Sequence, residues 1–81
     1  MTFEEAMTQL RAGKKITRTE IRHRMHFSMA FDTYYDHEFP VLLKHVNAAK
    51  PTEKERWRCF QVRGIPVYFI FAEDWEVFED E

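Results

Sequence analysis

The stretch TFEEAMTQLRAGKKITR, from Thr2 to Arg18, decides the fold because it combines a helix, a helix stop and the start of a strand. Thr2 and Glu5 have the spacing of a capping box, in which each side chain bonds the backbone N–H of the other. Gly13 supplies the left-handed conformation that ends a helix. A helix of about three turns is marginal alone, so the rest of the chain must provide a sheet for its apolar stripe. That stripe, at helical spacing, consists of Phe3, Ala6, Met7 and Leu10.

Alternating and continuous apolar segments predict the strands of this sheet. Met25 to Asp32 has the clearest alternation, with apolar residues at every second position. The segment from Pro40 to Ala49 fits a helix or a strand, and we favour a strand because an antiparallel meander needs a partner there. Val67 to Phe71, VYFIF, predicts a strand buried on both faces or at a subunit contact. Further strands are expected at 14–18, 56–63 and 75–78, with loops at 19–24, 33–39 and 47–55.

These elements predict an α+β fold with one N-terminal helix packed on a four- to five-stranded antiparallel sheet. A chain of 81 residues is expected to form a single domain, residues 1–81. Its 44% hydrophobic content allows it to fold, and its 16% aromatic content is high for a small core. We therefore expect some aromatic side chains to lie at a binding surface or in a homo-oligomer interface.

Charge is unevenly distributed along the chain, although the net charge is only −2. Basic residues dominate 11–24, and residues 73–81 contain six acids and no base. We expect these regions to face each other within the monomer or between subunits. The negative net charge argues against direct nucleic-acid binding. Cys59 is the only cysteine, which fits a reducing, cytoplasmic setting, and no signal-like or membrane-spanning segment is recognisable.

The residues typical of metal and catalytic sites do not form a recognisable pattern. His23 and His26 have a spacing that suggests a metal pair, with Asp36, His37 and Glu38 as additional ligands, but one cysteine cannot complete a structural zinc set. We favour two solvent-facing histidines and no metal. Cys59 is expected to be a small core residue. The two glycines form no phosphate-binding loop, so neither an enzyme nor a cofactor is predicted.

Arginine and aromatic side chains remain the candidates for ligand binding. Arginines on two segments can hold phosphates through bidentate contacts, and aromatic rings can stack on a base. The alternative is a solvated basic face that balances the acidic end. Trp75 is expected to fix the last strand to the core through its N–H, with Asp74 accepting backbone N–H groups. The arginines are Arg18, Arg22, Arg24, Arg56, Arg58 and Arg63, and the stacking candidates are Tyr34, Tyr35, Trp57 and Tyr68.

The two ends of the chain, FEEAMTQLRAGKKITR and AEDWEVFE, resemble a phage and prophage family. That family includes the Thoeris anti-defence proteins, which act as sponges for a cyclic ADP-ribose-type signal, and a type II-A anti-CRISPR protein is similar to it. Arg18 and the block from Ala72 to Val77 match the family pattern. The resemblance implies a viral counter-defence protein in the cytoplasm of a host cell, with an N-terminal helix and a final strand.

Two departures from the family pattern bear on the ligand. The family usually carries a tryptophan after the basic strand, where this chain has Ile21. It also has a polar run before its last motif, where this chain has the apolar segment from Pro66 to Phe71. An apolar run in place of a polar ligand loop favours protein contact or a tighter oligomer.

Two functional hypotheses follow. The first is a protein that binds and sequesters a nucleotide-derived signal without turning it over. Its ligand-binding residues would be Arg18, Arg22, Arg58, Trp57 and Asp74. The second is an inhibitor that contacts a host defence protein, using aromatic anchors and the acidic C-terminal tail. Its partner-binding residues would be Tyr34, Tyr35, Glu79, Asp80 and Glu81.

Overall fold

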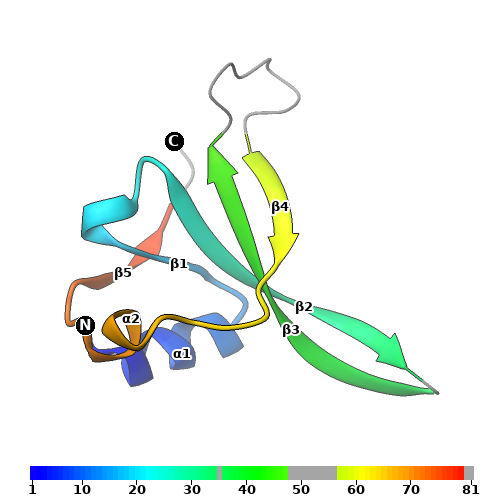
Figure 1. Ribbon diagram of the computed structural model, residues 1–81. Helices are drawn as coiled ribbons and strands as arrows, with labels where there is room; N and C mark the ends of the chain where they lie inside the picture. The colour runs from blue at the N-terminus through cyan, green and yellow to red at the C-terminus, as the bar shows by residue number, and fades with distance from the viewer. Residues whose placement is uncertain (35, 48–56, 80–81) are drawn as a thin grey trace.

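The computed structural model describes residues 1–34, 36–47 and 57–79, and it has two helices and a five-stranded antiparallel sheet (Figure 1). The strand order in the sheet is β4-β3-β2-β1-β5, so the last strand returns to pair with the first. The predicted α+β fold is confirmed. In chain order the elements are α1 (Phe3–Arg11), β1 (Lys15–Arg18), the 3-10 turn η1 (Thr19–Ile21), β2 (Met25–Tyr34), β3 (His37–Asn47), β4 (Trp57–Gln61), α2 (Val67–Phe71) and β5 (Trp75–Phe78).

Helix α1 has the ends that its sequence predicts. The Thr2 hydroxyl accepts from the Glu5 N–H at 3.3 Å, and the Glu5 carboxylate accepts from the Thr2 N–H at 3.0 Å. These bonds to Thr2 lower the pKa of the Glu5 carboxyl. Gly13 follows the helix with a φ of 89°, a left-handed conformation that favours glycine. The cap and the glycine together fix the direction in which the chain enters β1.

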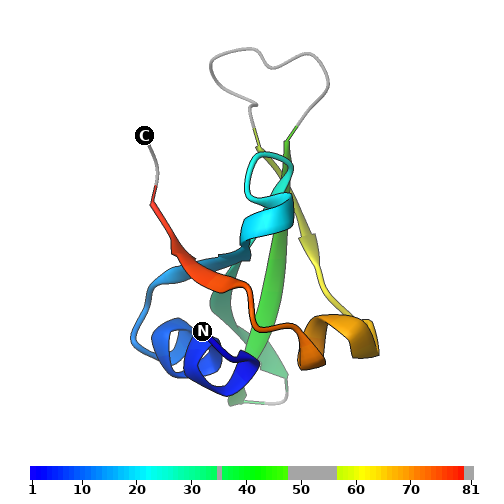
Figure 2. The same ribbon diagram turned by 90° about the vertical axis from the view of Figure 1, so that its left-hand side faces the viewer.

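The core lies between the two helices and one face of the sheet. Ile16 of β1 stands opposite Phe27 of β2, and both side chains point to the face that α1 covers. Figure 2 shows α1 and α2 side by side at one end of the sheet. The apolar stripe of α1 contributes two fully buried residues and two that pack at the rim. The buried core consists of Ala6, Leu10, Ile16, Phe27, Phe69 and Trp75.

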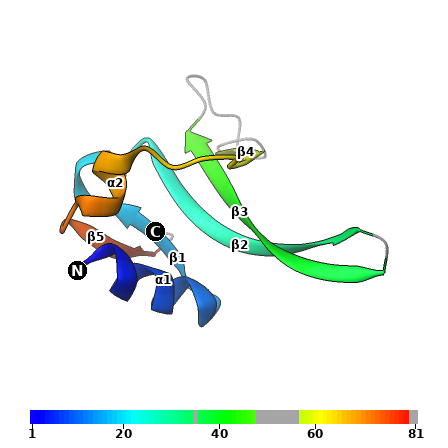
Figure 3. The ribbon, with the colours of Figure 1, turned by 60° about the horizontal axis from the view of Figure 1, so that its bottom comes forward.

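Strands β2 and β3 form a long hairpin whose far half extends beyond the rest of the sheet (Figure 3). Pairing runs from Met25 opposite Val46 to Tyr34 opposite His37. The predicted loop at 33–39 is therefore wrong, because both strands continue to a short turn in which Asp36 has a φ of 64°. Aspartate tolerates this left-handed conformation better than most residues. We call residues 30–34 and 37–41 the arm.

The segment on which the sequence left two alternatives, Pro40 to Ala49, is a strand as far as Asn47, which confirms the favoured reading. Residues 48–56, where we expect a loop, lie outside the described residues. The strand predicted for VYFIF is wrong. This run forms the short helix α2, of which only Phe69 is buried. Pro66 precedes it at the helix N-cap, and a short apolar run does not distinguish a strand from a helix by periodicity.

Candidate functional site

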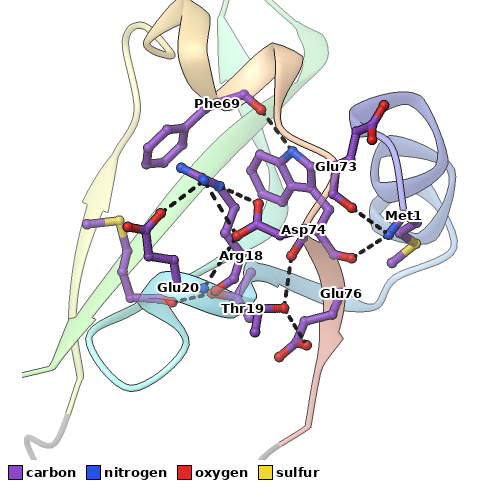
Figure 4. A network of polar contacts seen from close by, with 11 residues as sticks. Met1, Arg18, Thr19, Glu20, Phe69, Glu73, Asp74 and Glu76 are labelled. Carbon is purple, nitrogen blue, oxygen red and sulfur yellow. Dashed lines mark hydrogen bonds and ion pairs between the residues drawn. The ribbon is translucent and has the colours of Figure 1, made fainter.

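The strongest polar cluster in the described residues joins β1 to the segment before β5. Arg18 stands opposite Trp75 in the sheet, which places the preceding residue, Asp74, beside the arginine side chain. Arg18 Nε donates to Asp74 Oδ1 at 2.8 Å, and Nη2 donates to Glu20 Oε2 at 3.2 Å (Figure 4). The Arg18 residue is only 9% exposed. The predicted residues Arg18 and Asp74 therefore meet in one site.

The electrostatics of this pair keep both groups charged. The hydrogen bond from Arg18 lowers the pKa of the Asp74 carboxyl, and burial partly opposes this effect. The same hydrogen bond raises the pKa of the Arg18 guanidinium. The guanidinium carbon also lies 4.8 Å from the centre of the Phe69 ring, a cation–π distance. Arg18 thus holds η1, β5 and α2 together, and its charge is already matched within the chain.

Further contacts extend the network along both chain ends. The Thr19 hydroxyl lies 3.0 Å from Glu76 Oε2, and Arg22 Nη1 lies 3.2 Å from Glu76 Oε1. The N-terminal ammonium of Met1 donates to the carbonyls of Glu73 and Trp75 at 3.2 and 2.9 Å. The basic first third and the acidic C-terminal region face each other within the monomer, which is one of the two arrangements expected from the sequence.

Trp75 has the role that the sequence predicts. Its indole N–H donates to the carbonyl of Phe69 at 2.9 Å, and the residue is 3% exposed. This bond connects β5 to α2 inside the core. Asp74 also accepts from the backbone N–H of Glu20, at 3.4 Å, as expected of a residue that caps backbone groups.

The structure separates the other predicted ligand residues from this network. Arg58 is exposed on β4, and Trp57 lies on the sheet face opposite the core. Arg22 is joined to the network through Glu76 and remains partly exposed. The predicted nucleotide site is therefore divided: Arg18, Arg22 and Asp74 come together, whereas Trp57 and Arg58 lie on another strand. Of the predicted partner residues, Glu79 is exposed, and the Tyr34 side chain, Tyr35, Asp80 and Glu81 lie outside the described parts of the molecule.

A second cluster, on the face opposite the core, was not predicted. His26 is only 1% exposed, which contradicts the expected solvent-facing position, because its ring is stacked between those of Phe78 and His45. Trp57 on β4 and Phe78 on β5 lie 5.7 Å apart by ring centres, so the sheet curls until side chains of its two edge strands meet across this face. The alternation in β2 identifies the face of His26, but only this curl explains its burial.

Further polar side chains lie on that face of the sheet. Ser28 Oγ and His45 Nε2 are 2.7 Å apart, and Cys59 stands opposite His45 on β4. Cys59 is exposed, so its predicted place in the core is wrong, because its strand lies at the edge of the sheet. The described residues contain no group of three His, Cys, Asp or Glu side chains that could hold a metal ion. None of the helices in the described ranges has the length and apolarity needed to cross a membrane.

Large apolar side chains lie exposed in two main regions. On α2, Phe71 is 78% and Tyr68 is 65% exposed, and on the arm Phe31 is 63% exposed. The sequence predicted surplus aromatic residues, but it placed 67–71 in a strand that is buried on both faces or lies at a subunit contact. Among the described residues, the exposed large apolar side chains are Phe31 and Phe39 on the arm, Phe60 on β4, and Val67, Tyr68, Ile70 and Phe71 on α2.

Comparison with known proteins gives no match: no family model, no curated protein and no solved structure is significantly similar to this chain.

Proposed function

We propose that this protein is a non-catalytic counter-defence protein that inhibits its target by protein contact. The observation that carries the proposal is the exposure of four of the five residues of α2, all of them apolar. The counter-defence context comes from the resemblance at the two ends of the chain. In this proposal the protein works in the host cytoplasm, needs no cofactor and binds a host defence protein.

The exposed area is large enough to matter for binding. Each aromatic side chain offers about 150–250 Å², so Phe71 and Tyr68 together leave roughly 200–350 Å² in water. This is a substantial part of the roughly 800 Å² per partner that a standard interface buries. Monomeric proteins rarely expose contiguous apolar patches larger than a few hundred Å². A homo-oligomer that uses part of this surface is compatible with the proposal.

The second candidate is sequestration of a nucleotide-derived signal. The observation that favours it is the exposed ring of Tyr68, whose centre lies 6.0 Å from the Arg18 guanidinium carbon. A base could stack on this ring, with Arg22 as the phosphate ligand. We rank this function second because Arg18 is nearly buried and already paired with two carboxylates.

A capture experiment and a thermal-shift screen separate the two functions. Tagged wild-type protein and the Tyr68→Ser/Phe71→Ser variant would be compared for capture of purified defence effector complexes. Arg11→Ser, an exposed change on α1, is the matched control. Cyclic dinucleotides and ADP-ribose cyclic isomers would be screened in parallel, since a ligand that binds only the folded state raises its Tm.

Protein contact predicts capture by the wild type and by Arg11→Ser, loss of capture in the α2 variant, and no Tm shift with any nucleotide. A concentration-dependent Tm rise with one nucleotide, lost in Tyr68→Ser and Arg22→Ala and unaccompanied by effector capture, would overturn it in favour of sequestration. Arg18→Ala is unsuitable as the binding control here, because its loss breaks the contacts between η1 and Asp74.

A further inference from the structure

The arm has one open backbone edge, on the side of β2 that faces β1. The Thr17 hydroxyl donates to the Met25 carbonyl at 2.6 Å, which shows that the backbone groups of Met25 point towards β1. Backbone groups of residues two apart point to the same side of a strand, so those of Met29, Phe31 and Thr33 point the same way. β1 pairs with β2 at Ile16 and Phe27. Within the described residues, no strand borders this edge from Met29 onwards.

The opposite edge of the arm is closed to an added strand. The Val62 N–H donates to the Leu42 carbonyl at 2.8 Å, so the backbone of Leu42 points to the β4 side. Pro40, two residues earlier, directs its nitrogen to the same side and carries no N–H. Proline on an edge strand blocks pairing with another chain. The β2 edge is therefore the edge of the arm that can accept a strand.

Side chains along the β2 edge define what would fit beside it. Phe31 points to the face that α1 covers elsewhere in the sheet and is 63% exposed. The next residue, Asp32, lies on the other face, and its carboxylate accepts from the Thr33 N–H at 2.8 Å. Residues 25–43 contain no lysine or arginine and have three acids, Asp32, Asp36 and Glu38. An incoming strand thus meets the Phe31 ring on one face and the Asp32 carboxylate on the other, and Glu38, opposite Thr33, adds negative charge on the Phe31 face of β3.

We propose that the β2 edge of the arm binds an extended segment of the partner protein, in which apolar and basic residues alternate, as an added strand. The backbone of this segment would pair with Met29 and Phe31. Its apolar side chains would pack on Phe31, and its basic side chains would lie opposite Asp32, as cross-strand neighbours do. Such strand addition obtains affinity from backbone bonds and specificity from alternate side chains. The inference rests on the proposed function and assigns the arm to it.

The test uses fluorescent octapeptides and the full-length protein. One peptide alternates valine and lysine, and a second alternates valine and glutamate. Binding is followed by fluorescence anisotropy at low and high salt. The key variant is Phe31→Pro, which removes the ring and an outward N–H, whereas Phe31→Ala removes the ring alone. Phe60→Ala, at an exposed aromatic residue outside the arm, is the matched control.

We expect saturable binding of the lysine peptide, weakened by salt, and much weaker binding of the glutamate peptide. Phe31→Pro should lower the affinity about tenfold or more, beyond the effect of Phe31→Ala, since it removes a backbone donor as well as the ring. Phe60→Ala should bind like the wild type. If Phe31→Pro does not fold, lysine peptides N-methylated at alternate positions replace it. Methylation of the positions that face β2 should then abolish binding to the wild-type protein.

Several results would overturn the inference. Equal binding of both peptides, no saturable binding, or binding that Phe31→Pro leaves unchanged would each do so. If no peptide binds while Phe31→Pro dissociates an oligomer of the wild type, the occupant of the edge is a second copy of this chain. Failure of the proposed function can be distinguished from failure of this inference. In that case the wild-type protein captures no effector complex, but the lysine peptide still binds the arm.

Discussion

The body and the arm of this molecule contain the same kinds of residues but bury them to different extents. The body, made of α1, β1, β5, α2 and the base of β2, contains all six buried apolar residues of the described chain. The arm carries phenylalanine as well, yet Phe31 is 63% exposed and Phe39 39% exposed. Phe27 and Phe31 share one face of one strand, and only Phe27 is covered by the helices. Burial, not residue type, therefore decides which aromatic residues stabilise the fold.

The difference divides the molecule into a part that provides stability and a part that is available for binding. Each buried aromatic side chain contributes about 1.5–3 kcal/mol relative to an exposed one. A two-stranded ribbon such as the arm is marginally stable in water by itself. The body therefore holds the base of β2 and β3 in place, and the arm projects from it. Substitutions should separate the two parts by their effect on the free energy of unfolding.

The largest effect is expected at Trp75. Trp75→Ala should lower the free energy of unfolding by about 3–5 kcal/mol, because it leaves a cavity and an unpaired Phe69 carbonyl in the core. Phe71→Ala, at a residue 78% exposed, should change it by less than about 0.5 kcal/mol. Chemical denaturation measures both. Similar losses in the two variants would show that α2 is covered in solution.

A smaller effect is expected in the network that joins the body to its last strand. Arg18→Ala should cost about 1–3 kcal/mol, because it removes charge-assisted hydrogen bonds to Asp74 and Glu20 at a site with little solvent. Arg22→Ala breaks the more exposed pair with Glu76 and should cost less than about 1 kcal/mol. Urea midpoints of the two variants test this order. A larger loss for Arg22→Ala would contradict the assigned roles.

Acid should weaken the same network. The pKa of the Asp74 carboxyl is lowered in the folded protein, so its contribution is complete above about pH 5, where the unfolded carboxyl with its pKa of about 3.9 is also ionised, and it is lost as the pH falls from there through the folded pKa. The raised pKa of Arg18 has no effect in this range, because the guanidinium stays charged. Asp74→Asn should lower stability at neutral pH and lose less on acidification than the wild type does. If acidification lowered the free energy of unfolding equally in both proteins, Asp74 would not contribute to the acid sensitivity.

The smallest effect on stability is expected in the arm. Phe31→Ala should change the free energy of unfolding by less than about 0.5 kcal/mol, because the ring is mostly in water already. Peptide binding to the arm should nevertheless fall. Thermal denaturation and anisotropy on the same preparation measure the two effects. A clear loss of stability would show that the arm is packed against another surface in solution.

Part of the candidate site could be predicted from the sequence. The opposite charges of residues 11–24 and 73–81 predict that these two segments meet, and the Arg18–Asp74 pair confirms it. The predicted ligand set fails to converge because Trp57 and Arg58 lie on β4, which two strands, β3 and β2, separate from β1 in the sheet. No local sequence pattern indicates the order of the strands in the sheet. The arm was missed because the polar, aromatic segment at 33–39 lacks the glycine that usually marks a tight hairpin turn.

The sequence by itself determined the capped helix, its glycine stop, the alternating face of β2 and the anchoring role of Trp75. Each of these depends on neighbouring residues, which spacing alone reveals. Only the tertiary structure decided that VYFIF is an exposed helix, that His26 is buried and that Phe31 is not. These outcomes depend on β5 pairing with β1, on the curl that brings Trp57 to Phe78, and on where the helices stop covering the sheet. Such contacts join residues far apart in the chain, and burial is a property of that assembly.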